Sequence, residues 1–245
     1  MSHKSAAPLN FHGRSVQNQI LLGLPKPERL AILAKLEFVS LPAPSMLVEA
    51  GGTIKWVYFV NEGLASVLSV VTDGKSIEVG LCGHEGFVGL PLIAGFKTSP
   101  TRVIMQVGGS AFRMSSKDFR EVLRQSPTLA TALHRFGMEM ALQSTRVAAC
   151  NSVHEIDARL ARWLLMSHDR LGGDVVPLTQ EFLSHMLGSR RASVTVAAGA
   201  LQRKGLISYT RGSVVVKNRA GLESATCECY AGLTDEIEKW KSEVR

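Results

Sequence analysis

The chain has 245 residues, of which 45% are hydrophobic and 20% are charged, and its formal net charge is +7. This length fits two domains, the composition excludes a disordered or low-complexity chain, and the positive charge favours an anionic partner. No apolar run approaches the roughly 20 residues of a transmembrane helix and the N-terminal residues lack a signal peptide's apolar stretch, so we expect a cytoplasmic protein without membrane contact.

The N-terminal part of the chain predicts a tail, a helix and then a set of short strands. Residues 1–15 are polar and predict a flexible tail. A short amphipathic helix is predicted from near Pro27, with apolar residues at Leu30, Leu33, Ala34 and Leu36. Five runs rich in β-branched and aromatic residues predict strands at 56–60, 65–71, 75–81, 101–107 and 110–114. Asp73-Gly74 predicts a hairpin turn, and closely spaced short strands are typical of a sandwich or jelly-roll barrel.

After Pro127 the hydrophobic pattern changes to a helical period. Apolar residues recur at alternating steps of four and three, with one glutamine among them, at Leu129, Leu133, Phe136, Met140, Gln143, Val147 and Cys150. A heptad stripe of this length favours the seam of a parallel homodimer, in which Gln143 would fix the register or contact a ligand. The alternative is a helix that packs on its own barrel. The helical pattern continues through Trp163 and ends at Gly172-Gly173.

The segment 179–218 predicts two helices followed by a hairpin. Thr179 is a suitable cap for a first helix, Gly188 breaks the pattern, and Ser189 is a suitable cap for a second helix from Arg190 to about Lys204. The predicted buried residues are Phe182, Leu183, Met186 and Leu187 in the first helix and Val194, Ala197, Ala198 and Leu201 in the second. Two helices joined by a glycine-containing turn form a helix-turn-helix, and the hairpin around Arg211 would be its wing. Residues 221–245 predict a tail that ends in a short helix.

Basic residues concentrate around this predicted motif. Residues 170–219 hold eight Lys or Arg residues against two Asp or Glu residues. The first turns of a recognition helix enter the DNA major groove, where arginine can bind the guanine edge and serine or threonine can bind phosphates or bases. The candidate DNA-binding residues are Thr179, Gln180, Arg190, Arg191, Ser193, Thr195, Lys204 and Arg211. The pattern predicts a protein that binds double-stranded DNA.

With these motifs the chain resembles the Crp/Fnr (cyclic AMP receptor protein/fumarate-nitrate regulator) family of bacterial transcription regulators. Residues 178–207 resemble the family's DNA-binding signature, and residues 48–90 resemble the first strands of its cyclic-nucleotide-binding barrel. The resemblance implies an α+β protein with a β jelly-roll effector barrel at 16–126, a dimerisation helix at 127–150 and a winged helix-turn-helix at 151–220. It also implies a homodimer on an inverted-repeat operator and RNA polymerase as a partner.

The resemblance gives individual residues expected roles. Arg191 matches the family's base-reading arginine, whereas Ala192 and Val196 stand where other members carry side chains that can hydrogen-bond a base edge. We therefore expect an operator that differs from the best-known half-site of the family.

The effector cassette departs from that of the members that bind cyclic AMP. Leu90 stands where those members have the glutamate that holds the ribose, and Arg102 follows Thr101 instead of preceding it, so strand alternation points Arg102 to the opposite face. An apolar Leu90 leaves a ribose hydroxyl unpaired, which costs roughly 1–3 kcal/mol. The candidate pocket residues are Phe87, Val88, Gly89, Leu90, Thr101, Arg102 and Gln143. We expect an unknown small-molecule effector, not cyclic AMP, and no cofactor.

Two other functions compete with this interpretation. A cupin-like metal enzyme would need clustered ligands, but the barrel offers only His84 and Glu85 together, and no catalytic motif is present, so we expect no enzyme activity. A redox-responsive regulator would act through cysteine thiols, of which the chain has four: Cys82, Cys150, Cys227 and Cys229. These cysteines show no C-x-x-C spacing, so the sequence predicts free thiols and no metal site.

Overall fold

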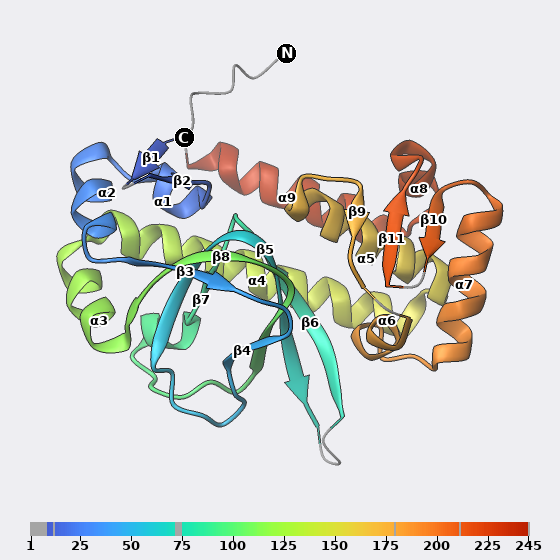
Figure 1. Ribbon diagram of the computed structural model, residues 1–245, viewed down its shortest axis with the longest axis horizontal. Helices are drawn as coiled ribbons and strands as arrows, with labels where there is room; N and C mark the ends of the chain where they lie inside the picture. Colours follow the sequence, from blue (N-terminus) through green and yellow to red (C-terminus); the bar gives the residue numbers. More distant parts are fainter. Residues whose placement is uncertain (1–8, 12, 72–74, 179, 211, 245) are drawn as a thin grey trace. The chain divides into compact units, whose positions relative to one another are not determined.

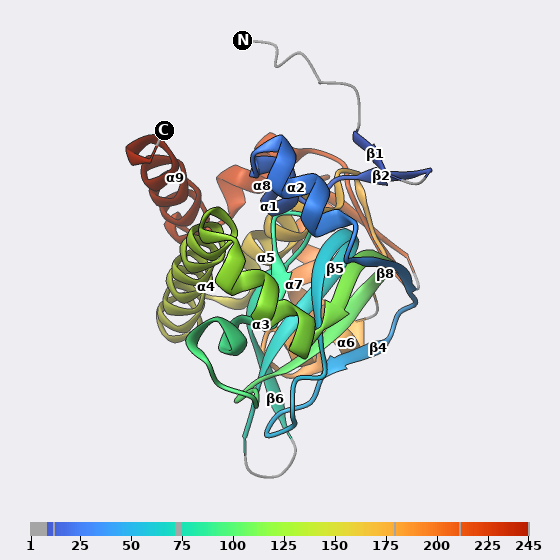
Figure 2. The same ribbon diagram turned by 90° about the vertical axis from the view of Figure 1, so that its left-hand side faces the viewer.

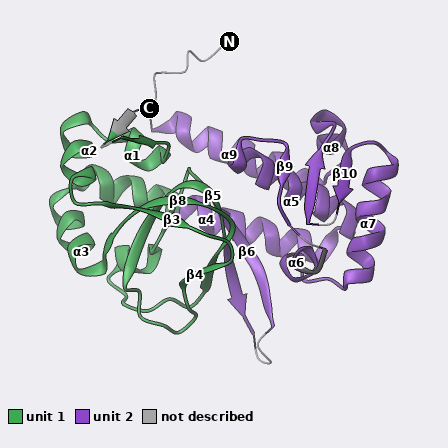
Figure 3. Cartoon of the chain, viewed as in Figure 1, with its two compact units in different colours: residues 1–65, 82–136 green, residues 66–81, 137–245 purple. Residues whose placement is uncertain are grey.

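A computed structural model of the protein describes residues 9–11, 13–71, 75–178, 180–210 and 212–244 (Figure 1). The chain forms two compact units. Unit 1 is built from residues 1–65 and 82–136, and unit 2 from residues 66–81 and 137–245 (Figure 3). The units divide between residues 136 and 137, and residues 66–81 group with the C-terminal unit. The expected domain boundaries at 126 and 150 stay predictions. Among the described helices, none combines the length and the apolar character that crossing a membrane requires.

Unit 1 holds most of the β-structure. Its elements are β1 (Leu9–Phe11), β2 (Arg14–Val16), α1 (Gln19–Gly23), α2 (Lys26–Leu33), β3 (Glu37–Leu41), β4 (Ser45–Val48), the first part of β5 (Trp56–Val70), β7 (Phe87–Val88), the 3₁₀ helix η2 (Leu90–Ala94), β8 (Arg102–Ser115) and α3 (Ser116–Gln125). The strands run in the order β3-β8-β5, with β4 paired to β8 and β7 paired to β5. Figure 2 shows β5 and β8 side by side. The predicted β-rich domain and the short helix near Pro27 are confirmed.

The two longest strands were each expected as two shorter ones. β5 runs for 15 residues and β8 for 14, straight through Gly63 and through Gly108-Gly109, which lie between the predicted shorter strands. The glycines mark a close approach of two backbones: a Cβ on Gly63 would lie 2.5 Å from the Val107 carbonyl oxygen, and one on Gly109 would collide with the Glu62 carbonyl. Glycine inside a strand often has this function. These glycines therefore permit pairing and do not end the strands.

The core of unit 1 is aromatic. The Phe87 ring lies 5.0 Å from Phe59 in an edge-to-face contact and 5.2 Å from Phe119, measured between ring centroids. All three side chains are buried. Phe87 on β7 thereby joins the long strand β5 to helix α3, a type of aromatic packing that adds to the simple gain from burial.

Unit 2 begins with a hairpin and continues with the C-terminal half of the chain. Its elements are the end of β5, β6 (Ser76–Cys82), most of α4 (Pro127–Val153), α5 (Ile156–Leu171), β9 (Val175–Val176), α6 (Gln180–Met186), α7 (Arg191–Arg203), β10 (Ile207–Thr210), β11 (Ser213–Val216), α8 (Arg219–Ala225) and α9 (Glu228–Glu243). β5 and β6 pair as the sequence predicted. The predicted turn residues Asp73 and Gly74 lie outside the described part of the chain.

Several predicted boundaries need correction. The helix that was expected to continue past residue 150 ends at Val153, and Glu155 has an extended backbone (φ −67°, ψ 157°). A new helix, α5, then begins, and Asp157 favours its first turn because an acidic side chain interacts well with a helix N-terminus. The expected C-terminal tail is the helix pair α8 and α9. Within the expected flexible tail 1–15, β1 and β2 pair as a hairpin because Gly13 adopts the left-handed turn conformation (φ +77°).

The predicted dimer seam is wrong. All its positions are buried within the single chain, with 0–7% of each residue exposed: Leu129, Leu133, Phe136, Met140, Gln143, Val147 and Cys150. A stripe that the chain itself covers cannot meet a partner helix. The alternative interpretation, a helix that packs on its own protein, is therefore the correct one for this face of α4.

Candidate nucleic-acid interface

The two helices expected between residues 179 and 204 are α6 and α7. The turn between them passes through Gly188, whose φ of +56° lies in the left-handed region that glycine adopts without strain. Backbone hydrogen bonds from Leu187 to the Leu183 carbonyl (2.9 Å) and from Ser189 to the Ser184 carbonyl (3.0 Å) close the end of α6. The predicted helix-turn-helix is confirmed.

Helix α7 is buried on one face only. Val194, Ala197, Ala198 and Leu201 are each no more than 3% exposed and form the predicted packing stripe. The other face turns to solvent and begins with basic and hydroxyl-bearing residues. Its exposed members in the first two turns are Arg190, Arg191, Ala192, Ser193, Thr195 and Val196. Three-dimensional packing thus leaves the polar side of α7 available to a partner.

The N-terminus of α7 is electropositive. Its N-cap residue is Arg190, whose side chain makes no capping hydrogen bond in the described structure. The expected cap, Ser189, instead donates from its hydroxyl to the Leu187 carbonyl at 3.2 Å, because that carbonyl lies within reach across the turn. Within the described residues no carboxylate forms an ion pair with Arg190 or Arg191. The helix dipole adds to these charges, and such a helix end attracts phosphate.

The predicted wing is present as β10 and β11. The two strands pair antiparallel from Ile207 opposite Val216 to Thr210 opposite Ser213, and β11 also pairs with β9. The Thr210 and Ser213 hydroxyls lie 2.9 Å apart at the end of the hairpin. The Gln202 side chain accepts a 2.7 Å hydrogen bond from the Tyr209 amide, so the wing is fixed to α7.

The structure describes most of the predicted DNA-binding residues. Those exposed on α7 or at its ends are Arg190, Arg191, Ser193, Thr195 and Lys204. Thr179 and Arg211 lie outside the described residues, and Gln180 is described only as the first residue of α6. The Thr195 hydroxyl donates to the Arg191 carbonyl at 2.9 Å, a bond within the helix.

One basic residue counted in the excess charge has an internal partner. The Arg219 guanidinium lies 2.7 Å from Asp169 and 3.0 Å from Glu223, and it also donates to the Tyr230 hydroxyl at 2.7 Å. Arg219 therefore ties α8 to α5 and α9 and adds no net positive charge to the DNA-facing surface.

The described candidate effector residues differ in their burial and in their partners. Phe87 and Val88 are buried in the aromatic core of unit 1, and Leu90 begins η2 after Gly89 (φ +128°). Arg102 pairs with Glu49, with Nε 2.8 Å from Oε1, and both side chains are partly exposed. This hydrogen bond is the main reason that the pKa of Glu49 is lowered.

Thr101 and Gln143 also have partners within their own unit. The Thr101 carbonyl accepts from the Ser99 hydroxyl at 2.7 Å. Gln143 is 3% exposed; its Oε1 accepts from the Leu81 amide at 2.6 Å and its Nε2 donates to the Leu81 carbonyl at 3.2 Å. Gln143 thus pairs with β6 as a neighbouring strand would. Because both ends of its amide are bonded to Leu81, the expectation that Gln143 fixes a dimer register is corrected, whereas its contact with a ligand stays a prediction.

A second stripe on α4 was not predicted from the sequence. Exposed residues recur at alternating steps of three and four on the side of the helix opposite the buried stripe: Thr131, His134, Met138, Ala141, Thr145, Ala148 and Ser152. The 3–4 spacing could have revealed it, but small and polar residues carry a weak hydrophobic signal. This series of seven residues is called the outer stripe below.

Comparisons with known proteins agree with this architecture. Residues 38–126 match the cyclic nucleotide-binding domain family and residues 158–225 match the Crp-like helix-turn-helix domain family. A comparison with curated protein sequences found no significant match.

Similar solved structures include a putative Crp/Fnr regulator from Eubacterium rectale (15% identity, 85% of this chain and 98% of that chain, TM-score 0.64). FixK2 from Bradyrhizobium japonicum is also similar (15% identity, 78% and 98%, TM-score 0.67). A third is the c-di-GMP responsive regulator CLP from Xanthomonas campestris (18% identity, 78% and 99%, TM-score 0.64). At these identities the likeness establishes the fold.

A cyclic-nucleotide-binding-type barrel followed by a winged helix-turn-helix defines the class of DNA-binding transcription regulators that sense an effector. The chain belongs to the Crp/Fnr family of these regulators.

Proposed function

We propose that the protein binds an inverted-repeat operator as a homodimer, with the N-terminal turns of α7 in the major groove. The observation that carries this proposal is the division of α7 into a buried apolar face and an exposed face that starts at Arg190 and Arg191. In a helix-turn-helix this end of the second helix reads base edges. Arg191 would bind guanine, and Ser193 would bind phosphate or a base. RNA polymerase would be the partner that turns binding into regulation.

The outer stripe of α4 is the surface that we propose for dimerisation. Met138 is 58% exposed on it. Several polar members are bonded to their own helix: His134 Nδ1 lies 2.8 Å from the Ala130 carbonyl, the Thr145 hydroxyl donates to the Ala141 carbonyl at 2.9 Å, and the Ser152 hydroxyl donates to the Ala148 carbonyl at 3.1 Å. Polar side chains that already hydrogen-bond to the backbone of their own helix cost little free energy to bury in an interface. The seven-residue spacing suits a symmetric helix pair.

The barrel would sense an effector other than cyclic AMP. Leu90 offers no acceptor for a ribose hydroxyl, and the Arg102 guanidinium is engaged by Glu49. Binding a cyclic phosphate through Arg102 would first require that ion pair to open. A distinct small molecule, recognised by other residues of the barrel, fits these side chains better.

Selection from a pool of random duplexes tests the proposal. We expect enrichment of an inverted repeat whose half-sites are about one helical turn, roughly 34 Å, apart. The selection is run with and without cyclic AMP, which should leave the enriched sequence and its affinity unchanged. Enrichment of a single half-site would overturn the dimeric arrangement, and enrichment only with cyclic AMP would overturn the effector proposal.

A further inference from the structure

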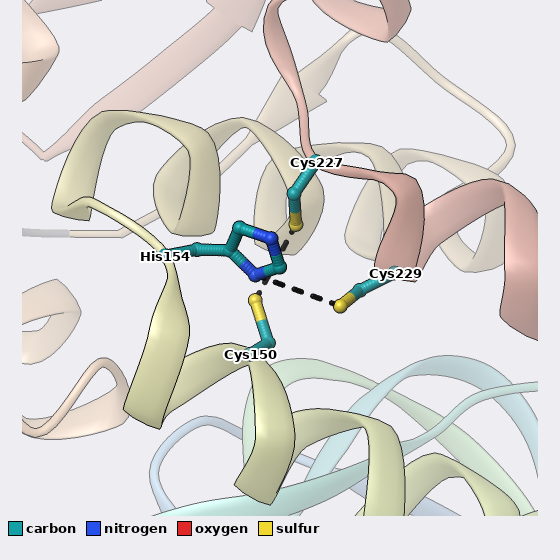
Figure 4. A group of neighbouring side chains, drawn as sticks. All are labelled: Cys150, His154, Cys227 and Cys229. Carbon is teal, nitrogen blue, oxygen red and sulfur yellow. Dashed lines mark hydrogen bonds between the residues drawn. The ribbon is translucent and has the colours of Figure 1, made fainter.

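Four side chains that can ligate a metal converge in unit 2 from segments far apart in the sequence. Cys150 lies in the last turn of α4, His154 directly follows that helix, and Cys227 and Cys229 lie at the start of α9. Their ligand atoms all lie within 4.8 Å of one another. Figure 4 shows the three thiols and the imidazole pointing toward one another.

The spacing of the ligand atoms matches a single tetrahedral ion. Cys150 Sγ lies 3.4 Å from Cys227 Sγ, and Cys229 Sγ lies 3.7 Å from His154 Nδ1. Zinc binds thiolate sulfur at about 2.3 Å and imidazole nitrogen at about 2.0 Å, which places neighbouring tetrahedral ligands roughly 3.5–3.8 Å apart. A polynuclear iron–sulfur cluster binds its thiolates through different iron atoms and needs a wider ligand set.

The imidazole is oriented as metal-bound histidines usually are. While Nδ1 of His154 faces the thiols, its Nε2 lies 3.2 Å from a carboxylate oxygen of Glu228. A carboxylate on the far ring nitrogen holds a ligating histidine in the correct tautomer and orientation. The sequence separates His154 and Glu228 by most of the DNA-binding domain, so only the fold reveals this contact.

Buried positive charge adjoins the thiols. Arg162 is 4% exposed and interacts with Cys150. Its Nη1 donates to the weak acceptor Met166 Sδ at 3.2 Å, and its Nε has no hydrogen-bond partner among the described residues. Three thiolates, a neutral histidine and a divalent cation carry a net charge of about −1, which a buried arginine would balance. If the cluster held only neutral thiols, the positive charge of the buried guanidinium would have no negative charge beside it to balance it.

The cluster can be reached from solvent. A pocket of about 430 Å³ lined in part by Cys227 and Glu228 gives an ion a route to the cluster from solvent.

From this geometry we propose that Cys150, His154, Cys227 and Cys229 bind one zinc ion as a tetrahedral three-thiolate, one-imidazole structural site. Binding replaces the thiol protons by the metal, and these protons leave to solvent. The ion would clamp the end of α4 to the start of α9 within unit 2. The proposal does not depend on DNA binding, because metal content and spectra are measured on the free protein.

Elemental analysis of the tag-free protein, purified in reducing buffer without chelator, is the first test. We expect about one zinc ion per chain, retained in Cys82→Ser and lost in Cys150→Ser and Cys229→Ser. Cys82 is the matched control because it is a buried cysteine outside the cluster. Substoichiometric zinc in the wild type, or zinc that also disappears in Cys82→Ser while folding is retained, would overturn the assignment.

Two further measurements cover variants that fail to fold. Replacing zinc by Co²⁺ in the wild type should give intense thiolate-to-cobalt charge-transfer bands and tetrahedral d–d bands. Glu228→Gln keeps all four ligands, and we expect about 10- to 100-fold weaker metal binding, whereas Glu238→Gln on the same helix should bind normally. Absent cobalt bands, iron with acid-labile sulfide, or a Cys150–Cys227 disulfide that persists in protein purified in reducing buffer would each contradict the site.

Discussion

The Trp163 indole donates a 2.7 Å hydrogen bond to the Glu78 carboxylate and thereby joins α5 to β6. Glu78 is 5% exposed and also accepts from the Ser66 hydroxyl at 2.6 Å. Burial raises its pKa from 4.5 to about 7, although both hydrogen bonds act in the opposite direction. The hairpin of β5 and β6 is thus anchored within unit 2 by a carboxyl group that titrates near neutral pH.

This anchor makes stability depend on pH. Because folding raises the pKa of Glu78, the folded state holds the proton more tightly, and the free energy of unfolding falls as pH rises from about 4.5 to about 7. The contribution amounts to about 3 kcal/mol at most. Glu78→Gln should remove this dependence and raise stability above pH 7. Urea titrations at several pH values measure the free energy of unfolding, with the exposed Glu121→Gln as control. If this free energy changes with pH in the same way in the wild type and in Glu78→Gln, Glu78 is not the group responsible.

Arg191→Ala should weaken specific DNA binding by about 1–3 kcal/mol and relax the preference at one base pair, because a guanine contact would be lost. Arg124→Ala removes an equal charge from α3 in unit 1 and serves as the control. Competition titrations against operators with single base-pair changes measure the preference. An unchanged preference with a uniform loss of affinity would show that Arg191 contacts phosphate only.

Met138→Glu should shift the protein from dimer to monomer, because it places a charge in the outer stripe of α4 where the partner helix would bury it. Sedimentation velocity at micromolar concentration measures the change, and circular dichroism checks that the variant stays folded. Gln125→Glu, at an exposed neutral position at the end of α3, is the control for the added negative charge. If Met138→Glu remains a dimer, the outer stripe is not the interface.

Gln143→Ala should lower the free energy of unfolding by about 2 kcal/mol or more, since it leaves the buried amide and carbonyl of Leu81 without their side-chain partner. The oligomeric state should not change, because Gln143 faces its own chain. Denaturant unfolding and sedimentation together measure both effects. Loss of the dimer with unchanged stability would restore the original seam interpretation.

The sequence predicted the elements with strong local patterns. The stripe of Val194, Ala197, Ala198 and Leu201 specified the orientation of α7, and Gly188 specified the turn before it. The direction in which the α4 stripe faces was not predictable, because a heptad pattern shows that one side of a helix is buried and not what covers it. Gln143 looked like a device for dimer register only because its partner, Leu81, lies 62 residues earlier.

The metal-ligand cluster could not be predicted from the sequence, because its residues lie far apart in the chain. Sequence rules for metal sites rely on short spacings such as C-x-x-C, and Cys150 and Cys227 are 77 residues apart. His154 was not predicted as a ligand, because a single histidine without neighbouring ligand residues in the sequence does not indicate a metal site. Only packing of α9 beside the end of α4 brings these groups together.

Fluorescence anisotropy tests whether two copies of α7 recognise a specific DNA sequence. The wild-type protein is titrated into a labelled duplex that carries the selected inverted repeat, and into duplexes in which one or both half-sites are scrambled. We expect tight, competitor-resistant binding of the intact repeat, weaker by about 10³-fold or more when both half-sites are scrambled. Equal affinity for the intact and the fully scrambled duplex would show that α7 does not read the base sequence.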